Sequence, residues 1–144
     1  MNRIPRRSRS RGSPIFEKRT GDILVRVISE YLAQESEPEN SLYYWGYTVE
    51  IENHGPQTVT LKSRHWIITD ALNQVREVKG EGVIGEQPVL NPREAFRYTS
   101  GSALRTTSGT MHGTYQMQVE GGGEFDVDIP LFSLDLPGAR KTLN

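Results

Sequence analysis

The segment from Leu42 to Asn53 constrains the fold of this chain more than any other stretch. The odd-numbered positions from 43 to 51 are all aromatic or aliphatic, whereas Thr48, Glu50 and Glu52 occupy even-numbered positions. Successive side chains of a β-strand point to opposite faces, so this alternation predicts a strand with one buried and one solvated face. The chain is therefore expected to contain a sheet that packs against a core.

Other short apolar runs predict the remaining strands. One spans Ile23 to Tyr31, and another spans Val59 to Asp70, where the alternation changes phase and predicts a β-bulge near Ser63. Shorter strands are predicted at 75–78, 89–90, 96–98, 114–120 and 125–129. The segments 33–41 and 100–113 are expected to be connections, and the glycines at 121–123 to form a hairpin turn. Pro130 should end the last strand or lie at a sheet edge.

These strands predict an all-β fold. About seven short strands without a helical pattern favour an immunoglobulin-like or fibronectin-III-like antiparallel β-sandwich, with a small barrel as the alternative. The chain has 144 residues, which suits a single core.

Charge divides the chain unevenly. Residues 1–20 carry seven basic residues against one acidic residue, although the whole chain has a net charge of −1. We expect a basic, disordered arm over 1–20, a domain over 21–137 and a flexible tail over 138–144. The arm could contact nucleic acid weakly through phosphate charge.

The absence of cysteine excludes disulfides and thiolate metal sites, and it fits a reducing compartment. Arg6 and Arg7 are not followed by the apolar segment of about 7–15 residues that an export signal needs. No apolar run approaches the roughly 20 residues that cross a membrane. We expect a cytoplasmic protein without membrane contact.

Three glycines between Val78 and Pro88, at positions 80, 82 and 85, have the GxGxxG spacing of a dinucleotide-binding fingerprint. Such a site needs a strand before the glycines and a helix after them, whose N-terminus holds the pyrophosphate. Here Pro88 introduces another extended run, so the helix is missing. Gly80, Gly82, Gly85 and Pro88 are therefore predicted to form a recognition loop, with nucleotide binding as the alternative.

Basic and aromatic residues near this loop form a second candidate group. The possible anion-binding residues are Lys62, Arg64, Arg76 and Lys79, and the possible surface contacts are Trp66 and Met111. Lys62, Arg64 and Trp66 share one strand face before any bulge is considered, which would present two cations and an aromatic ring to an anion. The alternative is solvated charges beside a buried tryptophan.

Neither a metal site nor a catalytic site is predicted. Glu124, Asp126 and Asp128 share a strand face, but residues two apart on a strand lie about 7 Å apart, which favours a solvated hairpin face. The three histidines, His54, His65 and His112, are scattered. No catalytic motif is present, so we expect a protein that is not an enzyme and uses no cofactor.

Five blocks of sequence carry a resemblance to a known family. They are SRHWIITDA at 63–71, VKGEGVIGEQPVLNP at 78–92, FRYTSG at 96–101, GTMHGTYQM at 109–117 and IPLFSLDLP at 129–137. In this order they resemble the bacterial ApaG family over roughly residues 21–137. One departure is Arg93, where the family usually has glycine; it predicts a type I rather than a type II turn.

The resemblance implies a fibronectin-III-like sandwich and an association with cobalt resistance and magnesium efflux. It also implies that the gene lies next to the gene of a diadenosine tetraphosphate hydrolase. In eukaryotes, related domains are fused to F-box proteins and to a polymerase-interacting protein. We therefore expect a non-catalytic module that binds a protein partner through the glycine loop and the adjoining strand face. The alternative is a sensor that binds a phosphorylated small ligand, nucleotide or metal ion at that loop.

Overall fold

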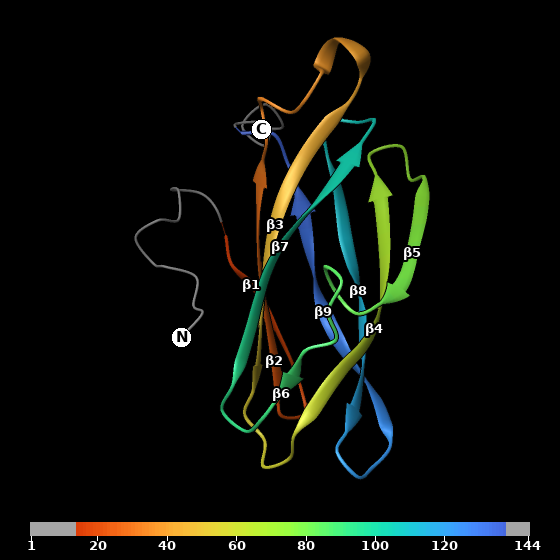
Figure 1. Ribbon diagram of the computed structural model, residues 1–144. Helices are drawn as coiled ribbons and strands as arrows, with labels where there is room; N and C mark the ends of the chain where they lie inside the picture. The colour runs from red at the N-terminus through yellow and green to blue at the C-terminus, as the bar shows by residue number, and fades with distance from the viewer. Residues whose placement is uncertain (1–13, 138–144) are drawn as a thin grey trace.

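Two antiparallel β-sheets pack face to face in the computed structural model, which describes residues 14–137 (Figure 1). The strands are β1 Phe16–Thr20, β2 Ile23–Tyr31, β3 Tyr43–Asn53, β4 Val59–Asp70, β5 Val75–Glu81, β6 Val89–Leu90, β7 Ala95–Leu104, β8 Gly109–Val119 and β9 Glu124–Leu134. A short 3-10 helix, η1, spans Pro38–Asn40. The predicted all-β sandwich is confirmed.

The order of the strands leaves one side of the sandwich open. One sheet has the order β1-β2-β3-β7, and the other has the order β5-β4-β8-β9, with β6 paired to β4. Strands β1 and β2 contact β9, so the sheets meet along that side. At the opposite side of the sandwich, the edge strands β7 and β5 each have only one neighbouring strand.

No helix within residues 14–137 has the length and hydropathy to cross a membrane.

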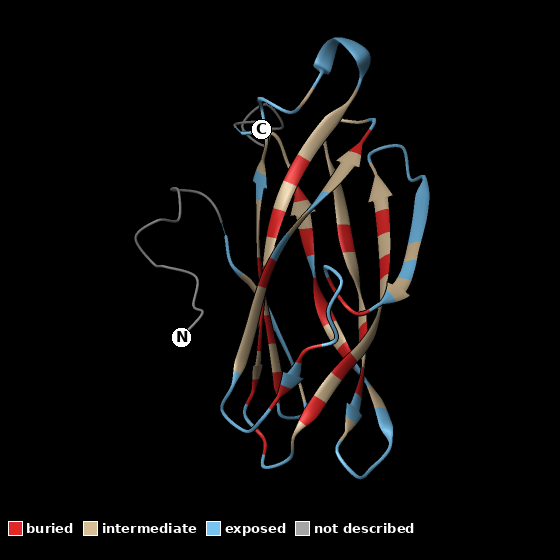
Figure 2. Cartoon of the chain, viewed as in Figure 1, coloured by how far each residue is buried: buried red, intermediate tan, exposed pale blue. Residues whose placement is uncertain are grey.

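The core lies between the sheets and follows the alternation read from the sequence, with one exception. Glu50, on the face predicted to be solvated, is also buried, and its Oε1 accepts a hydrogen bond from Arg26 Nη1 at 3.1 Å. In β3, Trp45, Tyr47, Val49 and Ile51 are buried (Figure 2). The ring of Phe132 on β9 lies at the centre, with centroid distances of 5.8 Å to Tyr47 and 5.9 Å to Trp66. This aromatic cluster joins the two sheets.

Two irregularities expected from the sequence are present. The register of β4 against β8 shifts between Leu61 and Ser63, which confirms the predicted bulge and leaves Lys62 as the extra residue. Pro130 lies inside β9, at an edge of its sheet, where the register against β8 also shifts. An edge strand tolerates proline because its missing N–H faces away from the ladder.

Two predictions about the extent of the strands are wrong. Phe16–Thr20 form β1, although the arm was expected to be disordered through residue 20. The Phe16 ring packs at 6.3 Å from Phe132, and Arg26 Nε donates to Glu17 Oε2 at 2.7 Å. The backbone of β1 pairs with β2, so this part of the predicted arm is a strand. Residues 1–13 and the predicted tail at 138–144 lie outside the described residues.

The segment 100–113 is not one long connection. Residues 100–104 continue β7, and residues 109–113 begin β8, so the connection is limited to 105–108. Small residues hid the strands because they lack the bulky apolar alternation that identifies a half-buried strand. Their pairing with β3 and β4 decides the conformation instead.

The turn at Asn91 to Glu94 is of type II, so the predicted type I turn is wrong. Glu94 N–H donates to Asn91 O at 3.0 Å, and Arg93 has a φ of 72°. A positive φ at the third turn position defines type II and favours glycine. Arg93 N–H also donates to Asn53 O at 2.8 Å, and this bond holds the residue in its strained conformation.

Replacing Arg93 by glycine is expected to raise the free energy of unfolding by about 0.5–1 kcal/mol, because glycine adopts the positive φ without a steric penalty. Asn73→Gly is the matched control, since Asn73 has a φ of 64° but asparagine tolerates this region well. Urea denaturation of both variants measures the difference. Equal changes for the two variants would contradict the assignment of strain to Arg93.

A pair of buried tyrosines makes the stability sensitive to alkaline pH. The hydroxyl groups of Tyr98 and Tyr115 form a hydrogen bond of 2.5 Å. Burial raises the pKa of each hydroxyl above that of free tyrosine. The unfolded chain therefore ionises first. The contribution of the pair to the free energy of unfolding is complete below about pH 10, and it is lost as the pH rises towards the folded-state pKa.

We expect the urea midpoint to fall as the pH rises above about 10, and to fall less in the Tyr98→Phe/Tyr115→Phe double variant. Ultraviolet absorbance of tyrosinate in the native protein provides a second readout, since these two side chains should ionise only on unfolding. Identical pH profiles for the wild type and the double variant would contradict this prediction.

Candidate functional site

A cleft opens between the edge strands β5 and β7, where the two sheets separate. Its volume is about 720 Å³. The lining comes from both sheets and from the loop after β2, and comprises Leu32, Glu35, Glu37, Tyr44, Trp45, Tyr47, Arg64, Trp66, Ile68, Arg76, Val78, Ser100, Gly101, Ser102, Ala103 and Met111. This size and largely apolar lining are typical of ligand-binding clefts.

The cleft exists because the inner face of β7 carries small residues. Tyr98 and Leu104 are buried on that face, but Ser100 and Ser102 between them are too small to fill the space between the sheets. Trp45, opposite Ser102, and Tyr47, opposite Ser100, form part of the floor. Trp45 Nε1 donates to Asp135 O at 2.9 Å, which fixes the indole orientation.

Arg64 lines the cleft from β4, and its guanidinium is held over the backbone of β5. Nη1 donates to Glu81 O at 3.0 Å and to Gly82 O at 2.8 Å. A Cβ on Gly80, the residue directly opposite on β5, would lie 2.9 Å from the guanidinium. Gly80 therefore makes room for this arginine and does not cradle a phosphate.

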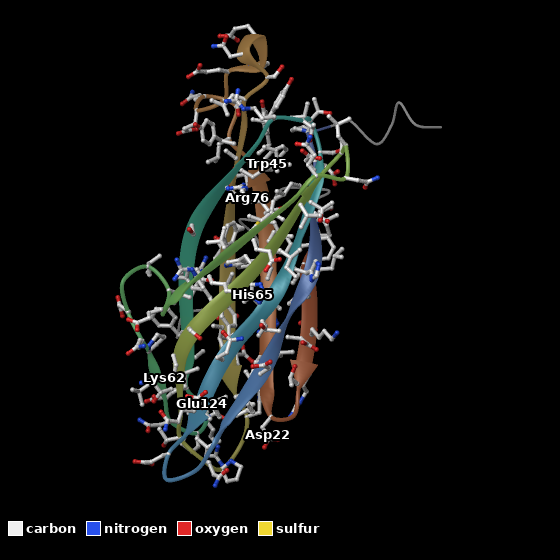
Figure 3. All side chains as sticks on the ribbon, turned by 90° about the vertical axis from the view of Figure 1, so that its right-hand side faces the viewer. Asp22, Trp45, Lys62, His65, Arg76 and Glu124 are labelled. Atoms are coloured by element: carbon white, nitrogen blue, oxygen red, sulfur yellow. The ribbon has the colours of Figure 1, made fainter. Side chains whose placement is uncertain are left out.

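Arg76 spans the cleft from β5 to β7. Its Nη2 donates to Ala103 O at 2.9 Å, and the side chain is otherwise exposed. Figure 3 shows Arg76 at the same end of the sandwich as Trp45. Glu35 and Glu37 line this end of the cleft from the loop after β2. The cleft thus contains two cations along its β4–β5 wall and two carboxylates at its end.

The structure separates the four residues predicted to bind an anion. Arg64 and Arg76 line the cleft. Lys79 lies opposite His65 in the strand register, and its side chain is on the other face of the sheet. Lys62 is the extra residue of the bulge and does not line the cleft; Figure 3 shows it nearer the other end of the sandwich than Arg76. The phase change at the bulge is the physical reason, because it ends the shared face of Lys62 and Arg64.

Trp66 and Met111 are core residues, so their prediction as surface contacts is wrong. Their exposed fractions are 2% and 1%. Trp66 packs edge-on against Tyr47, with a centroid distance of 5.3 Å. Both residues reach the bottom of the cleft, but neither presents a surface to a large partner.

The glycine loop after β5 is a tight turn anchored in the core. Val83 N–H donates to Glu86 O at 2.8 Å and Glu86 N–H donates to Val83 O at 2.9 Å, with positive φ at Ile84 and Gly85. Val83 and Pro88 are buried, whereas Ile84 at the tip is 54% exposed. A β-branched residue at a φ of 43° is a backbone outlier.

Gly82 is the glycine that the loop requires most. It has a φ of 60°, and a Cβ there would lie 2.0 Å from Glu86 O. Its N–H donates to Lys62 O at 2.8 Å. The amides of Gly82, Val83 and Glu86 are bonded to protein carbonyls, so these three N–H groups are not available to a phosphate.

The acidic residues of β9 and the histidines do not form a metal site among residues 14–137. Asp128 pairs with Lys18 Nζ at 3.4 Å, and Gln116 Nε2 donates to Asp126 Oδ1 at 3.4 Å. His54, just after β3, contacts Glu52 at 2.8 Å, and His65 on β4 contacts Glu77 on β5 at 2.8 Å, so the two histidines belong to different parts of the fold.

Sequence reasoning missed the residues of β7 that shape the cleft. Ser100, Gly101 and Ser102 were assigned to a connection, and Trp45 and Tyr47 were assigned only to a core face. The available signal was the pair of small polar residues that replaces bulky residues after Tyr98. It becomes informative only when β7 is known to face β4 and β5.

Comparisons with family models, curated proteins and solved structures all find the same family. The ApaG domain family matches residues 33–119. Protein ApaG of Caulobacter vibrioides is 60% identical over 139 residues, covering 96% of this chain and 99% of that protein. Protein ApaG of Brucella anthropi is 55% identical over 125 residues, covering 87% and 96%. A crystal structure of a Bordetella pertussis protein designated ApaA aligns with a TM-score of 0.78 and 44% identity, covering 87% and 97%.

Proposed function

Because the chain belongs to the ApaG domain family, we propose that it is a non-catalytic recognition module that binds a protein partner. The observation that carries the proposal is the exposed Ile84, held at positive φ on a turn whose base is anchored by buried Val83. Strained residues persist where the surrounding structure fixes them, and they concentrate at binding sites. Loops on rigid sheets commonly carry recognition.

The partner is proposed to connect the module with magnesium and cobalt homeostasis, the association that the family resemblance implies. Affinity capture from the native host under magnesium or cobalt stress tests whether a partner exists and whether it is connected with these ions. The wild type is expected to recover one stoichiometric partner, and Ile84→Asn is expected to lose it. Asparagine tolerates a positive φ, so this change removes the apolar side chain while retaining the turn.

Leu72→Asn is the matched control for this capture. Leu72 is also an exposed aliphatic residue, 71% accessible, but it lies in the turn between β4 and β5. This variant should retain the partner. Equal recovery with the two variants would contradict the role of Ile84, and the absence of any stoichiometric partner would contradict the recognition function.

The competing function is a sensor of a phosphorylated ligand or nucleotide, and the observation in its favour is that Arg64 and Arg76 line one cleft. Arginine forks suit phosphate oxygens. Titration calorimetry with ATP and with diadenosine tetraphosphate distinguishes the two functions. Saturable heat that is lost in Arg76→Gln would favour the sensor, whereas no heat at millimolar ligand favours the protein-binding module.

A further inference from the structure

The free edge of β7 faces the cleft. Arg76 Nη2 reaches Ala103 O, so this carbonyl points away from the ladder with β3. In an antiparallel ladder, successive residues point their N–H and C=O groups alternately to the two sides of the strand. Thr99 and Gly101 therefore present their backbone groups to the same open edge as Ala103.

This edge carries few obstacles to another strand. Gly101 and Thr99 are exposed, and only the Arg76 side chain is bonded to the edge among the described hydrogen bonds. The Oγ atom of Ser102, in the cleft lining, is buried without a hydrogen-bond partner. An unpaired buried hydroxyl is unfavourable, so a bound polar group that formed a hydrogen bond with it would be stabilised.

The chemistry of the cleft favours an extended peptide with an acidic residue. Leu32, Val78 and Ala103 supply apolar wall, while Arg64 and Arg76 supply positive charge along the wall opposite β7. Arginine binds carboxylates with charge-assisted hydrogen bonds. Glu35 and Glu37 make the end of the cleft near Leu104 acidic, which favours a basic group of the peptide there.

We infer that the partner of this module inserts an extended acidic segment into the cleft and adds it as a strand to the Thr99–Ala103 edge of β7. The peptide backbone replaces the Arg76 side chain on Ala103 O, and the released guanidinium binds the acidic side chain of the peptide. Strand addition takes affinity from main-chain hydrogen bonds and specificity from side-chain pockets. The inference rests on the proposed function, because it names where and how the partner binds.

The experiment selects peptides from a displayed random library against the full chain and measures the affinity of the enriched peptide by calorimetry. Enriched sequences should share an aspartate or glutamate within an alternating apolar segment. Gly101→Pro should weaken binding at least about tenfold, because it removes an N–H from the free edge. The fold should persist, since that N–H is outside the ladder with β3.

Charge-reversal variants test the arginine. Arg76→Glu should weaken binding at least about tenfold. Lys79→Glu makes the same charge change on the same strand but on the other face of the sheet, and it should change affinity less than about twofold at moderate salt. Dispersed amide resonances in each variant establish that it is folded.

Three results would overturn the inference: no enriched peptide, wild-type affinity in folded Gly101→Pro, or equal effects of Arg76→Glu and Lys79→Glu. A peptide that binds at Ile84 and not at β7 would refute the strand addition while leaving the recognition function intact. If the wild type yields neither an enriched peptide nor a captured partner, the recognition function itself is refuted.

Discussion

Gly82→Ala is expected to lower the free energy of unfolding by about 2–4 kcal/mol, because alanine combines an unfavourable positive φ with a steric clash. The added Cβ would lie 2.0 Å from Glu86 O, and a backbone oxygen cannot move without opening the turn at Val83. Urea denaturation measures the loss. Partner binding through Ile84 should weaken in the same variant, since the turn presents that side chain.

Gly85→Ala is the control for this effect. Gly85 also has a positive φ, of 80°, but a Cβ there would meet no atom within 4 Å. We expect a loss of about 1 kcal/mol, the conformational part alone. Equal losses at the two positions would show that the contact with Glu86 does not hold the loop.

Phe132→Ala is expected to cost about 3–5 kcal/mol, because it leaves a cavity at the centre of the aromatic cluster. The Phe132 ring is fully buried and contacts Phe16, Tyr47 and Trp66, which come from three other strands. Chemical denaturation should show a lower midpoint with an unchanged slope if unfolding remains two-state.

Phe125→Ala provides the matched comparison for Phe132. Phe125 lies on the same strand and is only partly buried, at the margin of the core. Its loss should be about 1–2 kcal/mol, in proportion to the smaller apolar area that it removes from water. A comparable loss for both variants would contradict the placement of the core centre at Phe132.

The fold could be predicted from the sequence to the extent that local patterns determine it. Alternation over residues 43–51 identified β3, and the phase change near Ser63 located the bulge. β1 could not be identified, because it contains one apolar residue among charges and forms by pairing with β2. The type II turn was missed because Arg93 is held at positive φ by a tertiary hydrogen bond to Asn53.

The candidate site was predicted less completely. Gly82, Gly85 and Pro88 lie in the connection after β5, but Gly80 belongs to β5 itself, so its assignment to the loop was wrong. The recognition role of the loop stays a prediction. The cleft could not be predicted, because it depends on which two strands form the open edges of the sandwich. Arg64 and Arg76 were selected, but Lys62 and Lys79 could be separated from them only after the bulge and the sheet faces were known.

The loop and the cleft lie on adjoining structure, so the proposed partner could contact both. Arg64 lines the cleft and also donates to the carbonyls of Glu81 and Gly82 at the base of the glycine loop. A partner that inserts a strand beside β7 can therefore reach the loop with neighbouring residues. Gly80 leaves room for Arg64, and Ile84 is the apolar contact of the proposed complex.

Amide hydrogen exchange at Gly101, with and without the enriched peptide, tests the central claim most directly. The Gly101 N–H faces the open edge of β7 in the free protein and would enter a new ladder in the complex. Strand addition predicts that saturating peptide slows its exchange at least about tenfold, while exchange at exposed Gly121 in the distant hairpin stays the same. An unchanged exchange rate at Gly101 under saturation would contradict strand addition at this edge.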